Sequence, residues 1–600
     1  MQSSQRVPQD LVAIFHASFH PTKGSLIDWS LRASDDLDLT NVEFSCLPSG
    51  LHLVEEDVVY FSKDSHQGVC VFRRRKTTEH GHRGFRLSSL GILLAKSARP
   101  RPWRHVAALK DLVHRIYSVL EDRGVLEPRE EDWEPARAFF EQRKVRRVDL
   151  AGAGDWNGWS HEFDGPSSDL HSIHPTMHLP HLLRILGPSS LTLYKHIFGR
   201  RRILIFTLPP VEASCILCQV AADMCLDSQV DSDVDTEGDR PGRLRGRCRE
   251  GVKVLGMVTL NDLDKLHQES QTGRGWIACT TDAIFLEKPS YYDLIIDLTT
   301  STPSKATRPT FYVSRPNQPS SSKGPSHRLS PIRFTWSDVK LWNEIDRLLE
   351  IDAADRDPIH HHACCAPGSH SGAEGVNSKA PGKLPPAWTD VWRIYEDVCL
   401  VCAGLWLGAW RNNSTMSYST VGQEGSSAPS NWGSVRLEGD DDLTVSGTYV
   451  RNVGMGIEGR PASESSEGSA KKPKSMRRNS GMSLATMKDK KRKDASSSTT
   501  VPAGADDRDV LTTMALLQTF HANTRFLLSR LAAYVPSSDA DAIPSSIVLT
   551  PKDILTFELG PLSSLDARFL EWLTEEYGGG VRVSVRKGWR DLVGLVLGLG

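Results

Sequence analysis

Two pairs of cysteines have the spacing of a zinc site. Cys215 and Cys218 form one C-x-x-C pair, and Cys399 and Cys402 form a second. Together they would supply the four thiolates of a tetrahedral zinc centre. Each pair, however, lies in an apolar run, ASCILCQVAA or DVCLVCAGLWLG, where free cysteine packs as a small hydrophobe and lacks the electropositive setting of a redox pair. We predict core packing for both pairs, with zinc binding as the alternative.

Histidines gather in two places. Residues 360–365 read HHHACC and precede His370, a combination of ligands that suits a transition metal. They lie in a low-complexity segment with no scaffold to fix a metal geometry, so an incidental tract is the preferred interpretation. A second group has no metal-binding spacing, and we predict surface or helix-cap roles for it: His171, His174, His178 and His181.

The motifs of phosphate binding and nucleophilic catalysis are missing from the sequence. There is no Gly-rich phosphate loop of the P-loop or dinucleotide type. There is also no nucleophile elbow and no kinase motif set. We therefore assign no catalytic, cofactor-binding or metal-ligating residue, and we expect no cofactor.

A basic cluster occupies residues 471–493, with ten Lys or Arg residues and one acid. A solvated charge run is the default interpretation, and nuclear import or contact with an anionic membrane are the alternatives. The sequence RRNS ending at Ser480 fits a basophilic kinase site, and a phosphate there would subtract charge. We hypothesise that phosphorylation of Ser480 weakens peripheral membrane contact. Equal binding of wild type and a Ser480→Glu variant to anionic vesicles would contradict this.

The elements that would carry these residues begin with a small α+β domain over residues 10–145. Short runs of strand formers follow one another from Leu11 to Leu94, with glycine punctuation. Apolar residues then recur at three- and four-residue spacing from Trp103 to Leu120, which predicts an amphipathic helix. A second helix is expected over Glu130–Val145. Antiparallel strands followed by helices indicate a small α+β domain. Residues 146–176 have the composition of a linker.

Residues 177–298 alternate between helix and strand patterns. Leu179–Phe198 predicts one helix or two, broken near Gly187, and the apolar run Ile203–Leu208 predicts a strand buried on both faces. Val211–Cys225 reads as a buried helix. Three further strands and a short helix follow, at Val252–Leu260, Trp276–Thr280, Asp282–Leu286 and Asp293–Leu298. This succession predicts an α/β sheet, interrupted by an acidic insert at 226–250.

The remaining residues alternate between polar inserts and helices. Residues 299–386 are expected to be mostly disordered around a helix at 338–349, and residues 412–509 form a Ser/Gly-rich insert that includes the basic cluster. A helix is expected at 387–411. Residues 510–600 predict a helical C-terminal region with helices at Val510–Val535 and Ser564–Tyr577 and a short strand at Val581–Val585.

Composition limits the class of protein. A chain of 600 residues is long enough for about three to five domains. The 72 Lys+Arg and 74 Asp+Glu give a formal net charge of −2, which argues against general nucleic-acid binding. Eleven cysteines in a long chain do not form a small secreted disulfide framework. Residues 1–10 are polar and the longest apolar run, 398–410, is too short to span a membrane. We therefore expect a cytoplasmic chain.

Four whole segments resemble a known family. They begin at Asp10 (DLVAIFHASFHPTKGSLIDWSL), Arg200 (RRRILIFTLPPVEASCILCQV), Gly275 (GWIACTTDAIFLEKPSYYDLIIDL) and Asp566 (DARFLEWLTEEYG). They are similar to DENN-module proteins of the LCHN branch, the family of DENN domain-containing protein 11. The resemblance covers roughly residues 10–300 well and 385–600 weakly. The latter region looks like the C-terminal extension of unknown function found in fungal members.

The resemblance implies a fold of several lobes, α+β and α/β, with long disordered inserts. A longin-like upstream DENN lobe would occupy 10–145, a central α/β DENN lobe 177–298, and a helical lobe the C-terminal part. It also implies guanine-nucleotide exchange on a Rab-type small GTPase in membrane traffic, with peripheral membrane contact through 471–493 as a further expectation. The family places the GTPase between the first two lobes, but the resemblance assigns no interface residue.

This role would explain why no catalytic constellation is found. An exchange factor makes no covalent bond but binds the GTPase better once the nucleotide has left. Such a surface is broad and apolar, with aromatic or Arg anchors. Two alternatives remain: a DENN-fold adaptor that binds a GTPase or membrane without accelerating exchange, and a zinc protein that uses the C-x-x-C pairs.

Overall fold

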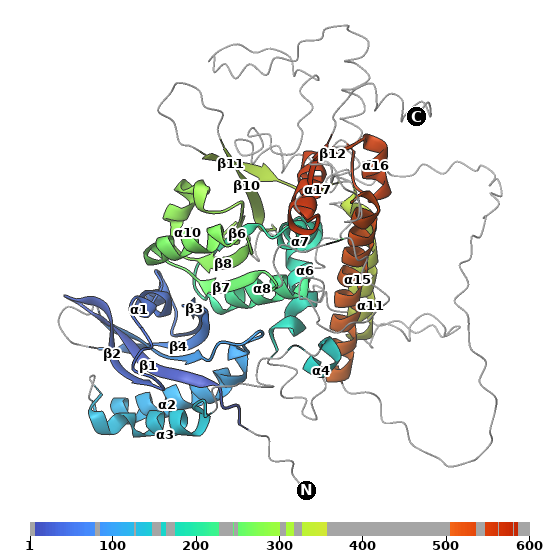
Figure 1. Cartoon of the computed structure of the whole chain (residues 1–600). Coiled ribbons are helices and arrows are strands. Elements are labelled where there is room, and N and C mark those ends of the chain that lie inside the picture. Colours follow the sequence, from blue (N-terminus) through green and yellow to red (C-terminus); the bar gives the residue numbers. More distant parts are fainter. Residues whose placement is uncertain are drawn as a thin grey trace, which may run out of the picture.

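The computed structural model of this chain contains a large mixed sheet as its central feature. It describes the following residues: 7–77, 84–124, 128–146, 156, 158–163, 174–226, 244, 250–300, 308–316, 327–335, 337–356, 505–535, 546–561, 563–579 and 581–585. The sheet has 11 strands in the order β11-β10-β9-β6-β8-β7-β3-β4-β5-β1-β2. Helices cover both of its faces, so the fold is mixed α/β (Figure 1).

Five antiparallel strands at one end of the sheet and their helices form one group of elements, which we call the upstream lobe. The strands are β1 (Leu11–His20), β2 (Gly24–Arg32), β3 (Glu56–Lys63), β4 (His66–Lys76) and β5 (Phe85–Leu94). The amphipathic helix expected after them is α2 (Val106–Asp122), which buries Leu109, Val113 and Ile116 against the sheet together with α3 (Glu134–Arg143). A short helix that the sequence pattern did not reveal, α1 (Val42–Cys46), packs on the opposite face.

The parallel strands of the same sheet and the helices that cover them form a second group, which we call the central lobe. They are β6 (Arg202–Phe206), β7 (Lys253–Met257), β8 (Trp276–Thr280) and β9 (Leu294–Asp297). Ile203, Leu204 and Ile205 are fully buried, which confirms the prediction of a strand covered on both faces. The buried helix α8 (Glu212–Asp223) packs on one face, and α10 (Leu263–Gln271), which was not predicted, packs on the other.

The two lobes meet at one point of strand pairing. β3 pairs antiparallel with β7 through Phe61 and Gly256. Gly256 has a φ of 69°, and a Cβ atom there would lie 2.3 Å from the carbonyl oxygen of Tyr60. Only glycine allows this close approach of the two backbones. The sequence predicted the two groups of strands but not that they share one sheet.

The expectation of disorder across residues 299–386 is wrong for two segments. β10 (Thr310–Pro316) pairs with β9, and β11 (His327–Ile332) pairs with β10 to form the edge of the sheet. Phe311 and Val313 alternate with polar residues and are buried, so a short two-residue period was hidden by the surrounding Ser and Pro. The expected helix at 338–349 is also longer, because α11 spans Asp338–Arg356.

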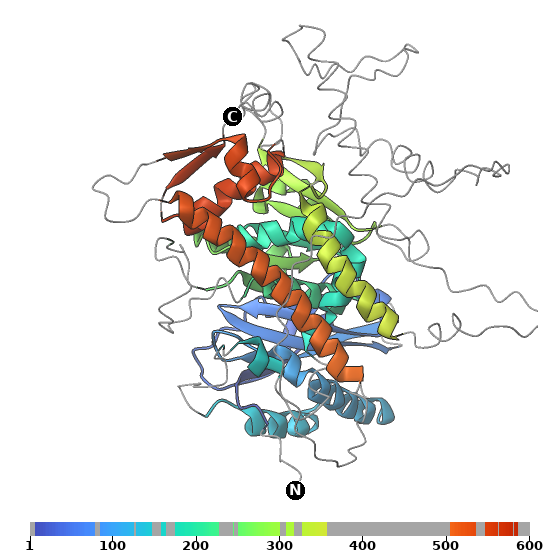
Figure 2. The same ribbon diagram turned by 90° about the vertical axis from the view of Figure 1, so that its right-hand side faces the viewer.

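The C-terminal region packs against the central lobe, mainly through helices. The predicted break near Gly187 separates α6 (Leu179–Leu186) from α7 (Ser190–Phe198). The long helix α15 (Ala505–Tyr534) lies alongside α11 (Figure 2), and α17 (Ser564–Tyr577) has the predicted bounds. Beside α16 (Pro551–Thr556), the predicted last strand, β13 (Arg582–Val585), pairs with β12 (Ser546–Leu549). One continuous apolar core joins these elements to both lobes.

Several predictions fall outside the described residues. They concern the helix at 387–411, the insert at 412–509 with its basic cluster and Ser480, most of the insert at 226–250, the tract 360–365 with His370, and Cys399 with Cys402. In the described ranges, no helix combines the length and apolar character that a bilayer crossing requires.

The packing of α7 against α17 makes stability depend on pH. The buried His196 ring lies 4.9 Å from the Trp572 ring, and its Nδ1 donates to the Thr192 carbonyl at 2.8 Å. Burial lowers the pKa of His196 to about 4, whereas an exposed histidine titrates near 6.5. Below pH 6.5 the unfolded chain therefore binds more protons than the folded chain. The free energy of unfolding consequently decreases as the pH is lowered.

We expect this histidine to remove about 2 kcal/mol of the free energy of unfolding between pH 7.5 and 5.0. Urea denaturation at the two pH values measures the loss in wild type and in a His196→Gln variant. The variant should be less stable at pH 7.5 but lose less on acidification. Equal losses in the two proteins would show that His196 is not held neutral.

Candidate functional site

The first cysteine pair belongs to the core. Cys215 and Cys218 are buried in α8, and the Sγ of Cys215 lies 3.5 Å from the Sγ of Cys279 in β8. Burial raises the pKa of the Cys218 thiol, which leaves it protonated and unreactive. Within the described ranges, no group of three or more His, Cys, Asp or Glu side chains is placed to hold a metal ion. The core-packing prediction is confirmed for this pair.

The histidines near residue 174 have the predicted roles where they are described. His178 and His181 are exposed. His174 is buried and caps a 3-10 turn, Pro175–His178, because its Nδ1 accepts from the backbone N–H of Thr176 at 3.2 Å. The same ring places its Nε2 3.1 Å from a Glu162 carboxylate oxygen.

Glu162 belongs to a buried charge cluster that the sequence did not predict. This junction cluster consists of Arg99, Arg101, Glu162, His174 and Asp223. Arg101 donates to both carboxylate oxygens of Glu162, at 2.9 and 2.7 Å, and Arg99 donates to Asp223 at 2.9 Å. The cluster joins the segment after β5 to the end of α8. It therefore links the two lobes with charge-assisted hydrogen bonds, which are stronger than neutral ones.

The linker prediction for residues 146–176 is therefore wrong in part. Residues Trp159–Phe163 form a short helix, α4, whose Trp159 and Phe163 side chains are buried. Trp156, Trp159 and Phe163 were the available signal, since aromatic residues at this spacing are unusual in an exposed linker.

The electrostatics of the junction cluster favour the charged carboxylate. Burial alone would raise the pKa of Glu162, but hydrogen bonds from Arg101 and His174 outweigh it and hold that pKa well below its usual range. Burial lowers the pKa of His174, which keeps its ring neutral. The cluster is thus a balanced structural network rather than a group poised for proton transfer.

A second feature lies at the carboxyl ends of the parallel strands. Leu208, Leu260 and Ile284 follow β6, β7 and β8, and their side chains are 56%, 39% and 39% exposed. Because β3 runs antiparallel to β7, its first residues reach the same edge, and they are preceded by Leu53, which is 65% exposed. Crevices at the carboxyl ends of parallel strands are the usual binding sites of open α/β sheets. We call these four residues the strand-end surface.

Hydrogen bonds between the lobes hold the segments that carry the strand-end surface. The Asp282 carboxylate accepts from the Ser49 hydroxyl of the upstream lobe at 2.8 Å and from the backbone N–H of Leu260 at 3.1 Å. Asp57, at the start of β3, accepts from the backbone N–H groups of Val211 and Glu212 at 2.7 and 3.2 Å. Asp57 thus caps α8 from the other lobe, because Val211 offers no side-chain cap. The four apolar side chains therefore lie on a surface that both lobes build.

The comparisons with known proteins concern the segment of the chain that carries this surface. Residues 14–308 match the family model of DENN domain-containing protein 11. These residues belong to that family. The matched segment includes both lobes, the junction cluster and the strand-end surface, and it ends before β10.

Relatives of the DENN segment come from animals and yeast. The chain is 29% identical to DENN domain-containing protein 11 of Rattus norvegicus over 293 residues, which is 48% of this chain and 57% of the rat protein. It is 27% identical to the Xenopus laevis protein over 291 residues, again 48% of this chain and 59% of the relative. Uncharacterized protein ANR2 of Saccharomyces cerevisiae is 26% identical over 318 residues, 48% of this chain and 58% of ANR2. The chain thus matches little more than half the length of these relatives.

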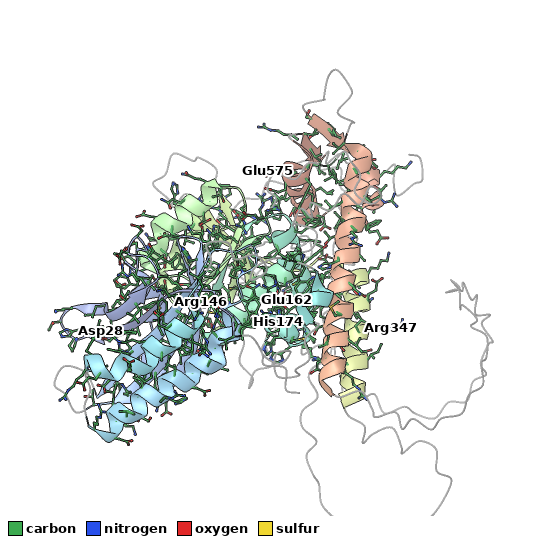
Figure 3. The ribbon with its side chains drawn as sticks, turned by 60° about the horizontal axis from the view of Figure 1, so that its bottom comes forward. Asp28, Arg146, Glu162, His174, Arg347 and Glu575 are labelled. Atoms are coloured by element: carbon green, nitrogen blue, oxygen red, sulfur yellow. The ribbon has the colours of Figure 1, made fainter. Side chains whose placement is uncertain are left out.

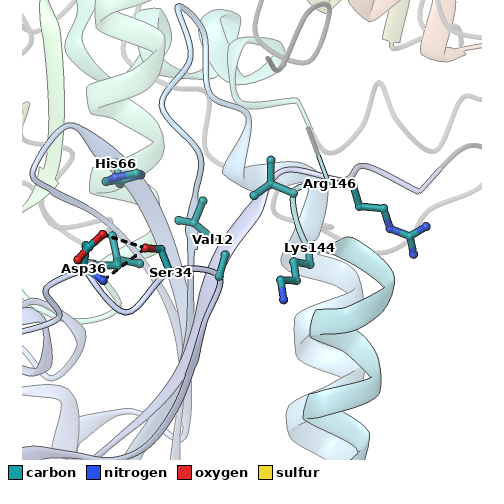
Figure 4. A pocket seen from close by; sticks show the side chains of 9 residues that line it. Val12, Ser34, Asp36, His66, Lys144 and Arg146 are labelled. Carbon is teal, nitrogen blue, oxygen red and sulfur yellow. Dashed lines mark hydrogen bonds between the residues drawn. The ribbon is translucent and has the colours of Figure 1, made fainter. Parts of the chain in front are cut away.

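Residues 14–308, which we call the DENN segment, also border an open hollow near the start of β1 and the end of β2. A cavity of about 420 Å³ is lined by Val12, Ser34, Asp36, His66 and Lys144, among others. Figure 4 shows the Arg146 side chain extending away from Ser34 and Asp36. The charged groups do not converge on one point, so the geometry lacks the convergent polar groups of a small-molecule site.

The strand-end surface was out of reach of sequence reasoning. Its residues come from four segments that are far apart in the chain, and each is a single leucine or isoleucine in a loop or 3-10 turn. Leu208, between an apolar strand and Pro209-Pro210, reads as the last residue of that strand. Only the strand order and direction place all four at the same end of neighbouring strands.

Proposed function

We propose that the protein is a guanine-nucleotide exchange factor for a Rab-type small GTPase in membrane traffic. The observation that supports this most is the family membership of residues 14–308, since DENN-domain proteins generally bind Rab GTPases. The strand-end surface, exposed and apolar, is the contact area that we propose for the GTPase. It suits a macromolecular partner, because exposed apolar patches on soluble proteins mark interaction sites.

The mechanism needs no reacting group. A surface that binds the nucleotide-free GTPase better than the loaded form weakens nucleotide binding by the same factor. A ten-thousandfold weakening requires about 5.5 kcal/mol of differential contact. Full burial of one leucine or isoleucine side chain stabilises a complex by about 1.5–3 kcal/mol. Burial of four half-exposed side chains therefore supplies a differential free energy of the required order of magnitude, if these side chains contact the partner only after a switch segment moves.

This proposal assigns a role to each part of the chain. We assign the longin-like role to residues 10–145 and the central DENN role to 177–298, with the C-terminal helices as a downstream lobe. The protein would act in the cytoplasm, with peripheral membrane contact through 471–493 and control of that contact by Ser480.

The proposal is tested by affinity for different nucleotide states. A panel of purified Rab GTPases would be titrated with the full chain in nucleotide-free, GDP-bound and GTP-bound forms. We expect at least one GTPase to bind tightest when nucleotide-free, and added GDP to dissociate that complex. Equal or stronger binding to the GTP-bound form would contradict exchange and indicate an adaptor.

A further inference from the structure

The short helix α4 lies where three parts of the chain meet. Glu162 contacts Arg101 of the upstream lobe and His174 at the start of the central lobe, and the Trp159 ring lies 6.4 Å from His521 of α15. Figure 3 shows Glu162 and His174 close together at this junction. A five-residue segment between two lobes thus contacts every main part of the fold.

The contacts of α4 are buried and specific. The side chains of Glu162, Arg101 and Arg99 are 3%, 8% and 5% exposed. The Arg99 guanidinium lies 5.0 Å from the centre of the Trp159 ring, which in turn stacks on Phe163. A buried carboxylate with a bidentate arginine partner is costly to disrupt. This segment is therefore held as firmly as a core element.

The junction cluster and the strand-end surface lie at opposite ends of the strands of the sheet. β5 runs parallel to β3, since both pair antiparallel with β4. The last residues of β5, which lead to Arg99, therefore lie at the opposite end of the strands from the first residues of β3, where Leu53 and Asp57 lie. In Figure 1, α4 lies at the foot of α15, across the sheet from α1 and α10.

Between these two edges, the strand pairing of the lobes is limited to Phe61 and Gly256. A single residue pair resists rotation weakly, and hinges are made of a few such positions. The angle between the lobes therefore depends on the contacts around the pair. These include the apolar core that α8 shares with both lobes and the hydrogen bonds from Gln67 to the Val254 carbonyl and from Lys265 to the Ser62 carbonyl. The junction cluster acts on one side, and the Asp57 and Asp282 hydrogen bonds act on the other.

We propose that α4 is a latch: by holding the junction cluster together, it fixes the angle between the two lobes and so the arrangement of the strand-end surface. Release of α4 lets the lobes rotate about the β3–β7 pairing and separates Leu53 from Leu208, Leu260 and Ile284. The regulatory consequence rests on the proposed function, but the mechanical coupling does not.

The test is hydrogen exchange of backbone amides in a Glu162→Gln variant of the full chain, without any GTPase. The amides of Val211 and Glu212 report on the remote edge, because they donate to Asp57 across the lobes. We expect their exchange to rise by about 10- to 100-fold when Arg101 loses its carboxylate partner. The matched control is Glu269→Gln, which neutralises a carboxylate paired with Lys253 in the central lobe, and it should leave these amides unchanged.

Two outcomes decide the question. Faster exchange at 211–212 in the Glu162→Gln variant alone supports the latch. Faster exchange confined to 158–163 and its immediate neighbours would overturn it and leave α4 as a local anchor. Should Glu162→Gln fail to fold, Glu162→Asp keeps the charge but shortens the reach, and the same amides should show a smaller rise. If the latch hypothesis is wrong, the proposed GTPase binding still stands. If the proposed GTPase binding is wrong, the exchange rates of these amides should still change as expected.

Discussion

Replacement of Lys195 by methionine is expected to lower the free energy of unfolding by about 3–5 kcal/mol. The Lys195 ammonium group is 4% exposed and lies between two aspartates, 2.7 Å from Asp338 and 2.5 Å from Asp566. It also donates to the Thr335 hydroxyl at 3.1 Å. Because Lys195 belongs to α7 and Asp566 to α17, the group joins the central lobe to the C-terminal region. Its loss leaves two buried carboxylates side by side without their cation.

The charge arrangement adds to this cost. Burial and then the neighbouring Asp566 raise the pKa of Asp338, while Lys195 opposes the rise. Without the lysine, at least one of the two carboxyl groups must take up a proton on folding. The loss of stability should therefore be larger at pH 8 than at pH 5.

The control is Lys340→Met in the same part of the protein. Lys340 is 66% exposed and pairs with Glu558 at 2.7 Å, and an exposed pair of this kind contributes about 0–1 kcal/mol. Denaturation in urea compares the two variants, with exchange protection in α17 to identify the region that unfolds first. Similar losses for Lys195→Met and Lys340→Met would contradict the docking of the C-terminal region described above.

The second large effect is expected at the strand-end surface. Leu208→Asp should weaken GTPase binding by at least about tenfold, because side chains at the centre of an interface cost about 2 kcal/mol or more when they are lost. The new carboxylate would also be desolvated without a partner. Leu208 is 56% exposed in the free protein, so the stability of the chain should hardly change. Binding is measured by titration against the GTPase that the panel selects.

Leu511→Asp is the matched control for this variant. Leu511 is 66% exposed and lies on α15, outside the DENN segment. It introduces the same carboxylate at a leucine of similar exposure but should leave GTPase binding within about twofold, as expected for a residue outside the interface. If the two variants weaken binding equally, or neither does, the strand-end surface is not the binding site.

The sequence predicted periodic elements well. The helix expected over Val510–Val535 is part of α15, and its regularly spaced Leu517, Phe520 and Leu527 side chains are buried. The bounds of α17 and the burial of β6 followed from the same patterns, because apolar spacing reports directly on which face is covered. Resemblance of whole segments then led to the DENN family without any short motif.

The functional features depended on contacts that pattern cannot reveal. Asp57 caps α8 from a residue 154 positions away, and Glu162 is buried only because Arg101 and His174 meet it. A charged residue in a Gly/Ser-rich stretch reads as exposed, since charged side chains are seldom buried without partners. Likewise, β10 was missed because a short alternating run between Ser and Pro carries little periodic signal.

The central claim is tested most directly by the rate of release of a fluorescent GDP analogue from a panel of purified Rab GTPases, with and without the full chain. We predict that the chain accelerates release from one or two GTPases in proportion to its concentration, and that Leu208→Asp removes the acceleration while Leu511→Asp keeps it. Unchanged release across the panel at saturating concentration, together with binding to a GTP-bound member, would contradict exchange activity and identify an adaptor.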